Sequence, residues 1–250
     1  MATILAVHAH PDDLDILAGG SLAYLSSVGR RVVMATATAG EGGSAEVGPA
    51  ELARVRQAEA AAAAAHIKAE YRCLGFPDLG VFNDDASRRA VTELLREVRP
   101  DVVITASPAD YHPDHEAISV LVRDACFAAP VANYKTGGAA ALPGIPALYF
   151  TDAIGGRDRG GTRLKRDFGA DISRHFAIKK AMIAEHRSQV SWVAKQHGVA
   201  DFLADTEAWS RRVGADFGVA YAEGFRQYLH TPYPKAAVLQ QLLGPLLLNP

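Results

Sequence analysis

The stretch ILAVHAHPDD, residues 4–13, joins a short apolar run directly to a polar segment rich in histidine and aspartate. An apolar run of this length that ends at polar residues is typical of a buried parallel strand. Further segments with strand character occur at residues 32–38, 71–74 and 102–105, and helix-forming segments separate them. This alternation predicts an α/β fold, a Rossmann-like, doubly wound and mostly parallel sheet, over residues 1–130.

The first helix is expected at residues 21–25, directly after Gly19 and Gly20. Pro49 is expected to open a long helix, because proline is tolerated in the first helical turn. Further helices are predicted at residues 90–98, 114–127, 178–186 and 205–213, and later strands at residues 149–152 and 170–172.

No internal repeat and no long linker divides the chain, so we expect a single domain over residues 1–250. Residues 131–250 are expected to supply C-terminal elements that complete the pocket of the core at residues 1–130. The apolar tail, residues 239–248, is expected to pack as a cap, and a subunit contact in a homo-oligomer is the alternative.

The composition argues against several classes of protein. The 250 residues are 49% hydrophobic and 22% charged, as in ordinary globular proteins. The 26 basic and 28 acidic residues give a formal net charge of −2, which argues against nucleic acid or an anionic membrane surface as partner. No stretch approaches the ~20 apolar residues of a membrane span. With two cysteines and no signal-peptide pattern, we expect a cytoplasmic protein without a disulfide framework.

Two clusters of histidine and aspartate each follow a predicted strand. HAHPDD, residues 8–13, follows the first strand, and YHPDHE, residues 111–116, comes shortly after the strand at residues 102–105. In a doubly wound sheet, the loops at the carboxyl ends of the strands meet at one crevice, where ligands bind. We therefore expect the two clusters to converge.

The chemistry of these clusters suits a catalytic zinc ion, which takes three protein ligands from imidazole and carboxylate groups and keeps one open position. His10 and Asp13 form an H-x-x-D pair, and His115 supplies the third ligand. Fe²⁺, Co²⁺ and Ni²⁺ suit the same set of two histidines and one carboxylate. We expect His8 to be a packing residue at the end of the strand.

The other polar groups of the clusters suit amide hydrolysis. Asp12 is expected to act as general base, His112 to stabilise an oxyanion or protonate a leaving amine, and Asp114 to orient His112. The simpler interpretation of one His-Pro-Asp sequence is a turn, and Asp12 and Asp13 also fit a helix N-cap. Two such sequences, each placed after a strand, favour the metal site.

At these residues the chain resembles the PIG-L/LmbE family of zinc-dependent N-acetylglucosaminyl deacetylases. The family's A-H-P-D-D motif matches residues 9–13, and its H-P-D-H motif matches residues 112–115. Weaker matches extend the resemblance over nearly the whole chain: Gly19-Gly20, Arg56 with Glu59, and residues 75–78, 186–189 and 221–225.

The resemblance implies zinc ligands at His10, Asp13 and His115, with Asp12 as base and His112, supported by Asp114, near the tetrahedral intermediate. It also implies that Arg56 and Asp78 hold sugar hydroxyls, although a surface ion pair or a turn explains them equally well. Some members of the family place a catalytic tyrosine near H-P-D-H. Tyr111 stands beside His112 and is assigned to substrate binding, and Asp110 occupies the other position considered.

The chain departs from the family pattern in the first loop. Leu14 stands where an acidic residue is common, with the acid one place later at Asp15, and Leu17 stands where a small residue is common. Both leucines are expected at the entrance side of the loop, which implies a substrate other than plain N-acetylglucosamine.

The sequence thus predicts a zinc-dependent hydrolase that removes an acetyl or other acyl group from the amine of an N-acetylated amino sugar or sugar conjugate. The main alternative is a hydratase, or another C–N hydrolase, that uses the same metal, water and aspartate on a small molecule that is not a sugar. A nucleotide-binding Rossmann protein is disfavoured, because no G-x-G-x-x-G follows the first strand. A non-catalytic metal or sugar-binding module is disfavoured by Asp12 beside an open coordination position.

Overall fold

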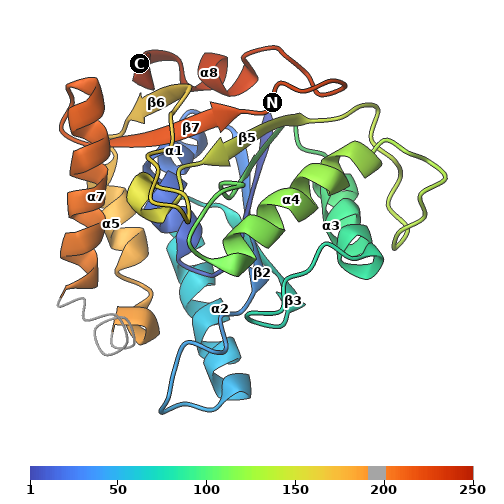
Figure 1. The fold of residues 1–250 in the computed structure, drawn as a ribbon, viewed down its shortest axis with the longest axis horizontal. Coiled ribbons are helices and arrows are strands. Elements are labelled where there is room, and N and C mark those ends of the chain that lie inside the picture. Colours follow the sequence, from blue (N-terminus) through green and yellow to red (C-terminus); the bar gives the residue numbers. More distant parts are fainter. Residues whose placement is uncertain (191–200, 250) are drawn as a thin grey trace.

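The computed structural model describes residues 1–190 and 201–249, and it contains an eight-stranded sheet with helices on both faces (Figure 1). The strands lie in the order β3-β2-β1-β4-β5-β7-β6-β8. They are β1 (Thr3–His8), β2 (Arg31–Thr38), β3 (Glu70–Phe76), β4 (Val102–Thr105), β5 (Ala147–Thr151), β6 (Phe168–Asp171), β7 (Ala222–Gln227) and β8 (Leu247–Leu248). The helices are α1 (Asp13–Ser27), α2 (Pro49–Ala65), α3 (Asp85–Val98), α4 (Pro113–Ala128), α5 (Phe176–Ile183), α7 (Phe202–Phe217) and α8 (Val238–Leu243), with 3₁₀ turns η1 (Ile154–Gly156) and η2 (Gly244–Leu246).

The five strands from β3 to β5 pair in parallel, which confirms the predicted α/β class with a mostly parallel, doubly wound sheet. The remaining strands are antiparallel: β7 pairs with β5 and β6, and β8 pairs with β6. Neither β7 nor β8 was indicated by the sequence. The segment AEGFRQ of β7 lacks both a continuous apolar run and a regular alternation.

Strand β1 lies inside the sheet, with Val7 paired to Ala35 of β2 and to Thr105 of β4. The chain winds from β1 outward to β2 and β3, and then places β4 on the other side of β1. The loops after β1 and β4 consequently leave the sheet side by side at a topological switch point, where ligands bind in sheets of this kind. This is the convergence expected from the sequence.

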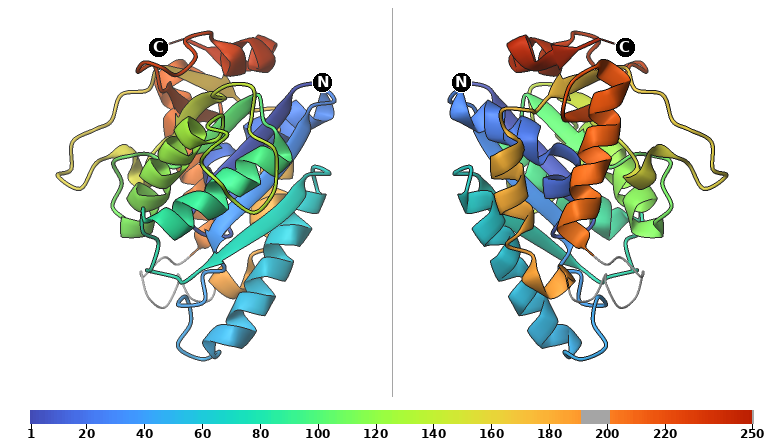
Figure 2. Two further views of the ribbon diagram at one scale, coloured as in Figure 1. Left: turned by 90° about the vertical axis from the view of Figure 1, so that its right-hand side faces the viewer. Right: turned by 90° about the vertical axis from the view of Figure 1, so that its left-hand side faces the viewer.

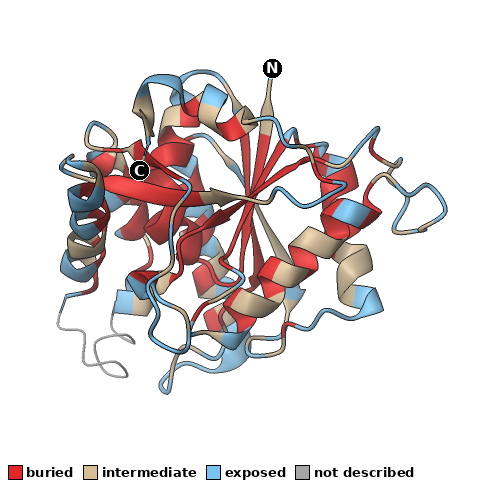
Figure 3. Ribbon diagram, turned by 45° about the horizontal axis from the view of Figure 1, so that its top comes forward, coloured by how far each residue is buried: buried red, intermediate tan, exposed pale blue. Residues whose placement is uncertain are grey.

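Alternate residues of β1 face two separate hydrophobic cores. Ile4 and Ala6 pack with side chains of α1, α2, α5 and α8, whereas Leu5 and Val7 pack with side chains of α3 and α4. Figure 2 shows these helices as layers on opposite faces of the sheet, and Figure 3 shows that the central strands are buried. Because both faces are covered, the strands are apolar on both sides, and polar groups gather at the strand ends.

Helix α1 begins at Asp13 and passes through Gly19 and Gly20, so the prediction that this helix starts after the two glycines is wrong. Gly20 lies against the buried Ile172 so closely that a β-carbon would come within 2.7–2.9 Å of three of its side-chain atoms. This glycine therefore serves close packing inside the helix. Leu14 and Leu17 are also buried on α1, at 1% and 2% exposure, so their expected place at the entrance of the first loop is wrong.

A buried carboxylate on β7 fixes the middle of α1. Glu223 accepts hydrogen bonds from the backbone N–H groups of Gly20 and Ser21 at 2.9 and 2.8 Å, and from Lys179 Nζ of α5 at 2.7 Å. Lys179 is fully buried and Glu223 is 3% exposed, so the ion pair is shielded from water. This contact ties α1 to α5 and β7, and thereby fixes the helix whose first turn carries Asp13.

The apolar C-terminal tail is a cap, as expected. Leu239 and Leu243 of α8 are fully buried in the core that contains α1, and β8 extends the sheet beside β6. Within residues 1–190 and 201–249, no helix combines the length and the apolar character needed to cross a bilayer.

The two glycines of α1 give a matched test of this packing. We expect Gly20→Ala to lower the free energy of unfolding by about 1–3 kcal/mol, because overpacking against Ile172 outweighs the better helix propensity of alanine. Gly19→Ala is the control. Its β-carbon would lie 3.4 Å from the Lys179 side chain, an ordinary contact, so the propensity gain of up to about 1 kcal/mol remains. Denaturant unfolding of both variants checks the expectation, and equal effects would contradict it.

Candidate active site

A cavity of about 730 Å³ lies where the loops after β1 and β4 meet. Eight of the nine side chains expected at the site line it: His10, Asp12, Asp13, Arg56, Asp78, Tyr111, His112 and His115. The ninth, Asp114, is buried at 2% exposure, and its Oδ2 lies 3.5 Å from Nε2 of His10. The sheet topology thus brings together groups that are about 100 residues apart in the chain.

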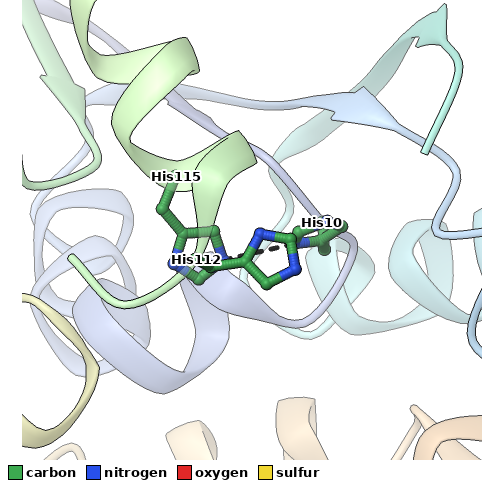
Figure 4. A group of neighbouring side chains, drawn as sticks. All are labelled: His10, His112 and His115. Atoms are coloured by element: carbon green, nitrogen blue, oxygen red, sulfur yellow. Dashed lines mark hydrogen bonds between the residues drawn. The ribbon is translucent and has the colours of Figure 1, made fainter. Parts of the chain in front are cut away.

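Three polar atoms form a nearly equilateral triangle in the cavity. His10 Nδ1 lies 3.2 Å from His115 Nε2, and Asp13 Oδ2 lies 3.3 Å from each of these nitrogens. In a tetrahedral zinc site with bonds of about 2.0–2.1 Å, ligand atoms stand roughly 3.3 Å apart. The three residues expected to bind metal therefore have the spacing of three corners of such a tetrahedron. Figure 4 shows the contact between His10 and His115, with His112 beside them.

The far nitrogens of both histidines lie next to carboxylates. His10 Nε2 is 3.2 Å from Asp78 Oδ1 and 3.5 Å from Asp114 Oδ2, and His115 Nδ1 is 3.2 Å from Asp110 Oδ1. A carboxylate at the far nitrogen holds a proton there and leaves the other nitrogen free to bind a metal. The tautomers that these contacts favour therefore turn an unprotonated nitrogen of each ring toward the triangle.

Asp13 is held by two further donors. His8, expected as a packing residue, is fully buried, and its Nδ1 lies 2.6 Å from Asp13 Oδ2. The backbone N–H of His10 donates to the same oxygen at 2.7 Å. Burial lowers the pKa of His8 and favours the neutral ring. The Asp13 carboxylate can only accept, so the 2.6 Å contact places the proton on Nδ1, the nitrogen that also lies 3.0 Å from the backbone nitrogen of Ala9. His8 therefore orients the carboxylate of the expected metal ligand.

Asp12 lines the cavity at the N-cap position of α1. Arg56 of α2 is only 3% exposed and donates to Asp12 Oδ1 at 3.2 Å and to the carbonyl of Gly40 at 2.8 Å. Gly40 has φ +67°, and a β-carbon there would collide with the guanidinium group. Arg56 thus fixes the position of the expected base, and its expected contact with sugar hydroxyls stays a prediction.

His112 is the N-cap of α4, and its Nδ1 accepts the backbone N–H of Asp114 at 3.2 Å. Burial, together with repulsion from His10 and His115, lowers the pKa of His112 and favours the neutral ring. A neutral imidazole that accepts at Nδ1 carries its proton on Nε2. The ring packs on His115 with centroids 4.8 Å apart, so this donor lies beside the triangle.

The carboxylate of Asp114 binds the turn after β3. It accepts hydrogen bonds from the backbone N–H groups of Leu79 at 2.8 Å and Val81 at 3.4 Å, besides its approach to His10. Asp78, in this turn, accepts the N–H of Gly42 at 2.9 Å. Backbone N–H groups therefore hold the carboxylates of Asp114 and Asp78 beside the His10 ring. The expected roles of Asp114 toward His112 and of Asp78 toward sugar hydroxyls stay predictions.

The charges of the site favour a cation at the triangle. Burial acts to lower the pKa of His10, but hydrogen bonds to Asp114, Asp13 and Asp78 outweigh it and raise the pKa well above its usual range. Burial acts to lower the pKa of His115 as well, but attraction to Asp13 and the 3.2 Å contact with the Asp110 carboxylate outweigh this effect, and the pKa rises to about 9. The surrounding carboxylates thus stabilise positive charge where the three donor atoms face one another, and this donor set fits Zn²⁺.

Sequence reasoning missed one group at the centre of the site. Asp110 was considered only as an alternative position to a tyrosine, yet it is fully buried beside His115. It also accepts the backbone N–H groups of His112 at 3.1 Å and Ile154 at 3.2 Å. An acidic residue two places before His-Pro-Asp-His was the available signal. Tyr111, by contrast, is 55% exposed at the cavity, with its ring 5.7 Å from that of His112.

Comparisons with known proteins agree with this geometry. The PIG-L family model, described as GlcNAc-PI de-N-acetylase, matches residues 5–126. A protein of Saccharomonospora viridis named 1D-myo-inositol 2-acetamido-2-deoxy-alpha-D-glucopyranoside deacetylase is 31% identical over 82% of this chain and 92% of its own length. A protein of the same name from Kineococcus radiotolerans is 34% identical over 54% of this chain, and that match spans 48% of the relative.

Solved structures with the same fold belong to enzymes of different kinds. N,N'-diacetylchitobiose deacetylase from Pyrococcus horikoshii is 22% identical and aligns over 94% of this chain and 88% of its own, with a TM-score of 0.78. The 4-carboxy-2-hydroxymuconate hydratase of Pseudomonas putida is 23% identical over 95% of this chain and 100% of its own, with a TM-score of 0.74. At these identities the likeness establishes the fold alone. The match to the Saccharomonospora viridis protein over most of both chains, together with the paired motifs, shows that the chain belongs to the PIG-L family.

Proposed function

We propose that the chain is a zinc-dependent hydrolase that removes an acetyl or related acyl group from the amine of an N-acetylated amino sugar or sugar conjugate. The observation that carries the proposal is the triangle of His10, Asp13 and His115, with Asp12 and His112 lining the same cavity. The deacetylase names of the relatives support the choice of an N-acyl amino sugar.

His10, Asp13 and His115 would hold the metal through Nδ1, Oδ2 and Nε2. Zinc, when bound, polarises a carbonyl and makes a water molecule more acidic. Asp12, held in place by Arg56, accepts a proton from the attacking water. His112 donates from Nε2 to the oxygen on which negative charge develops, and it needs no rearrangement because its Nδ1 is already occupied. The proton taken up by Asp12 returns to the departing amine, directly or through His112.

The first experiment is release of primary amine from a panel of N-acetylated amino sugars by the zinc-loaded protein. Amine release supports the proposal and begins to rank the substrates. Water addition to a double bond, the alternative reaction, yields no amine, so activity only on unsaturated acids would contradict the deacetylase assignment.

Asp12→Asn separates proton transfer from metal binding. We expect a loss of about 10²–10⁴-fold in kcat for amine release, because a general base contributes about this much and the amide cannot accept the proton. Zinc content, measured by atomic emission, should stay at the wild-type level, because Asp12 is outside the triangle. His10→Ala is the matched comparison, since it should lose both zinc and activity. Near-normal turnover by Asp12→Asn would show that Asp12 is not the base.

Asp110→Asn tests the support of His115. We expect zinc affinity to fall about 10–100-fold, because groups that orient a ligating histidine have effects of this size. Competition with a chromophoric chelator measures the affinity. Asp124→Asn on α4, the helix that carries His115, is the control, because Asp124 pairs with Asn83 and Arg123, away from the cavity. Equal zinc affinity in both variants would contradict a role of Asp110 at the metal site.

A further inference from the structure

The cavity is lined by side chains of two kinds. The polar ones are the triangle, Asp12, Arg56 and His112, together with Gln189, Asp205, Thr206 and Arg212. Large apolar or aromatic side chains from five separate segments line it as well: Ile16, Leu79, Tyr111, Ile154, Phe202 and Trp209. The volume of about 730 Å³ lies in the upper part of the range for ligand pockets, about 300–1,000 Å³. A sugar ring with its acyl group placed at the triangle therefore leaves some of these apolar side chains uncovered.

Leu79 lines the cavity and has a strained backbone conformation. Its φ is +60°, in the left-handed region that disfavours side chains other than glycine, asparagine and aspartate. Asp114 and Asp78 hold this conformation by accepting the Leu79 N–H at 2.8 and 3.0 Å. The side chain is 67% exposed and lines the cavity, so no burial within the protein repays the strain. A glycine or asparagine would make the same turn, and strain retained near an active site indicates a role for the side chain.

Trp209 of α7 also lines the cavity and is held by its neighbours. Its ring packs on Gly156, where φ is +68° and a β-carbon would lie 2.9 Å from the indole. The guanidinium groups of Arg166 and Arg212 lie 5.9 and 5.5 Å from the ring centre. Phe202, seven residues earlier on the same face of α7, adds a second aromatic surface at 9% exposure. An aromatic surface held in this way binds an apolar group with little loss of side-chain entropy.

We infer that the substrate carries an apolar substituent, an aryl or alkyl group, beside its N-acyl amine, and that Leu79 and Trp209 bind this group. The inference rests on the proposed function and specifies its substrate class. The substituent has two possible points of attachment, the glycosidic oxygen of the sugar or the acyl group itself, and both give the same apolar contact.

Binding of three ligands tests the inference without turnover. Isothermal titration of the zinc-loaded Asp12→Asn protein gives Kd for methyl N-acetyl-β-glucosaminide, phenyl N-acetyl-β-glucosaminide and methyl N-hexanoyl-β-glucosaminide. We expect at least one of the two apolar ligands to bind about tenfold or more tightly than the methyl N-acetyl compound, because burial of one aryl or alkyl group increases affinity by about this factor. The tighter of the two identifies the point of attachment. Equal Kd values for all three ligands would overturn the inference.

Two variants in the Asp12→Asn background link the preference to the wall. Leu79→Asn keeps a residue that accepts positive φ, so the turn is preserved while the apolar group is lost. Trp209→Ala removes the indole ring that α7 presents to the cavity. Each should reduce the ratio of Kd values to about threefold or less. Leu229→Ala is the control, because Leu229 is 49% exposed outside the cavity, and it should keep the full ratio. An unchanged ratio in both wall variants would also overturn the inference.

The wild-type protein then separates this inference from the proposed function. Amine release from any of the three ligands is measured under the same conditions. A protein that prefers an apolar ligand but releases no amine would contradict the proposed hydrolysis and support the apolar subsite. A protein that releases amine but binds all three ligands equally would support hydrolysis and overturn the apolar subsite.

Discussion

One carboxylate oxygen, Asp13 Oδ2, stands at the centre of the site and constrains everything around it. It lies 2.6 Å from His8 Nδ1, 2.7 Å from the backbone nitrogen of His10, and 3.3 Å from the facing nitrogens of His10 and His115. Asp13 is 4% exposed, so this negative charge has been removed from water and needs compensation inside the protein. The His8 ring and the backbone N–H of His10 supply part of this compensation. The open face of the triangle is left for a cation.

The fold makes this arrangement possible by directing two helix N-termini at one point. Helix α1 begins at Asp13, and α4 begins at Pro113 with Asp114 and His115 in its first turn. Carboxylates in a first helical turn are stabilised by the helix dipole, which partly offsets the cost of burying them. The same geometry explains why the switch point lies between β1 and β4. There the ends of the neighbouring strands β1 and β4 place the two helix starts side by side.

The sequence was sufficient to predict the parallel half of the sheet and the meeting of the two motifs, because both follow from local patterns and from general rules of connection. It was not sufficient for Asp110 or for the approach of Asp78 to His10, since these depend on tertiary distances. The start of α1 was misplaced because glycine normally marks a loop, whereas Gly20 is required here by contact with Ile172. Strand β7 was missed because its pairing, not its composition, makes it a strand.

The polar and apolar side chains of the cavity differ in the contacts that hold them in position. The triangle and its supporting carboxylates come from residues 8–116, and each is tied to another by a hydrogen bond or ion pair, so a change in one disturbs several. Trp209 and Phe202, which also line the cavity, come from α7, outside that network. Substitutions on α7 therefore alter the shape and polarity of the cavity without moving the donor atoms. Leu79 differs from these residues, because its backbone N–H binds Asp114 while its side chain lines the cavity. Its position, like that of Ile154, whose N–H binds Asp110, is set by the groups around the metal site, and so Leu79 couples the place of the apolar group to the place of the reacting carbonyl.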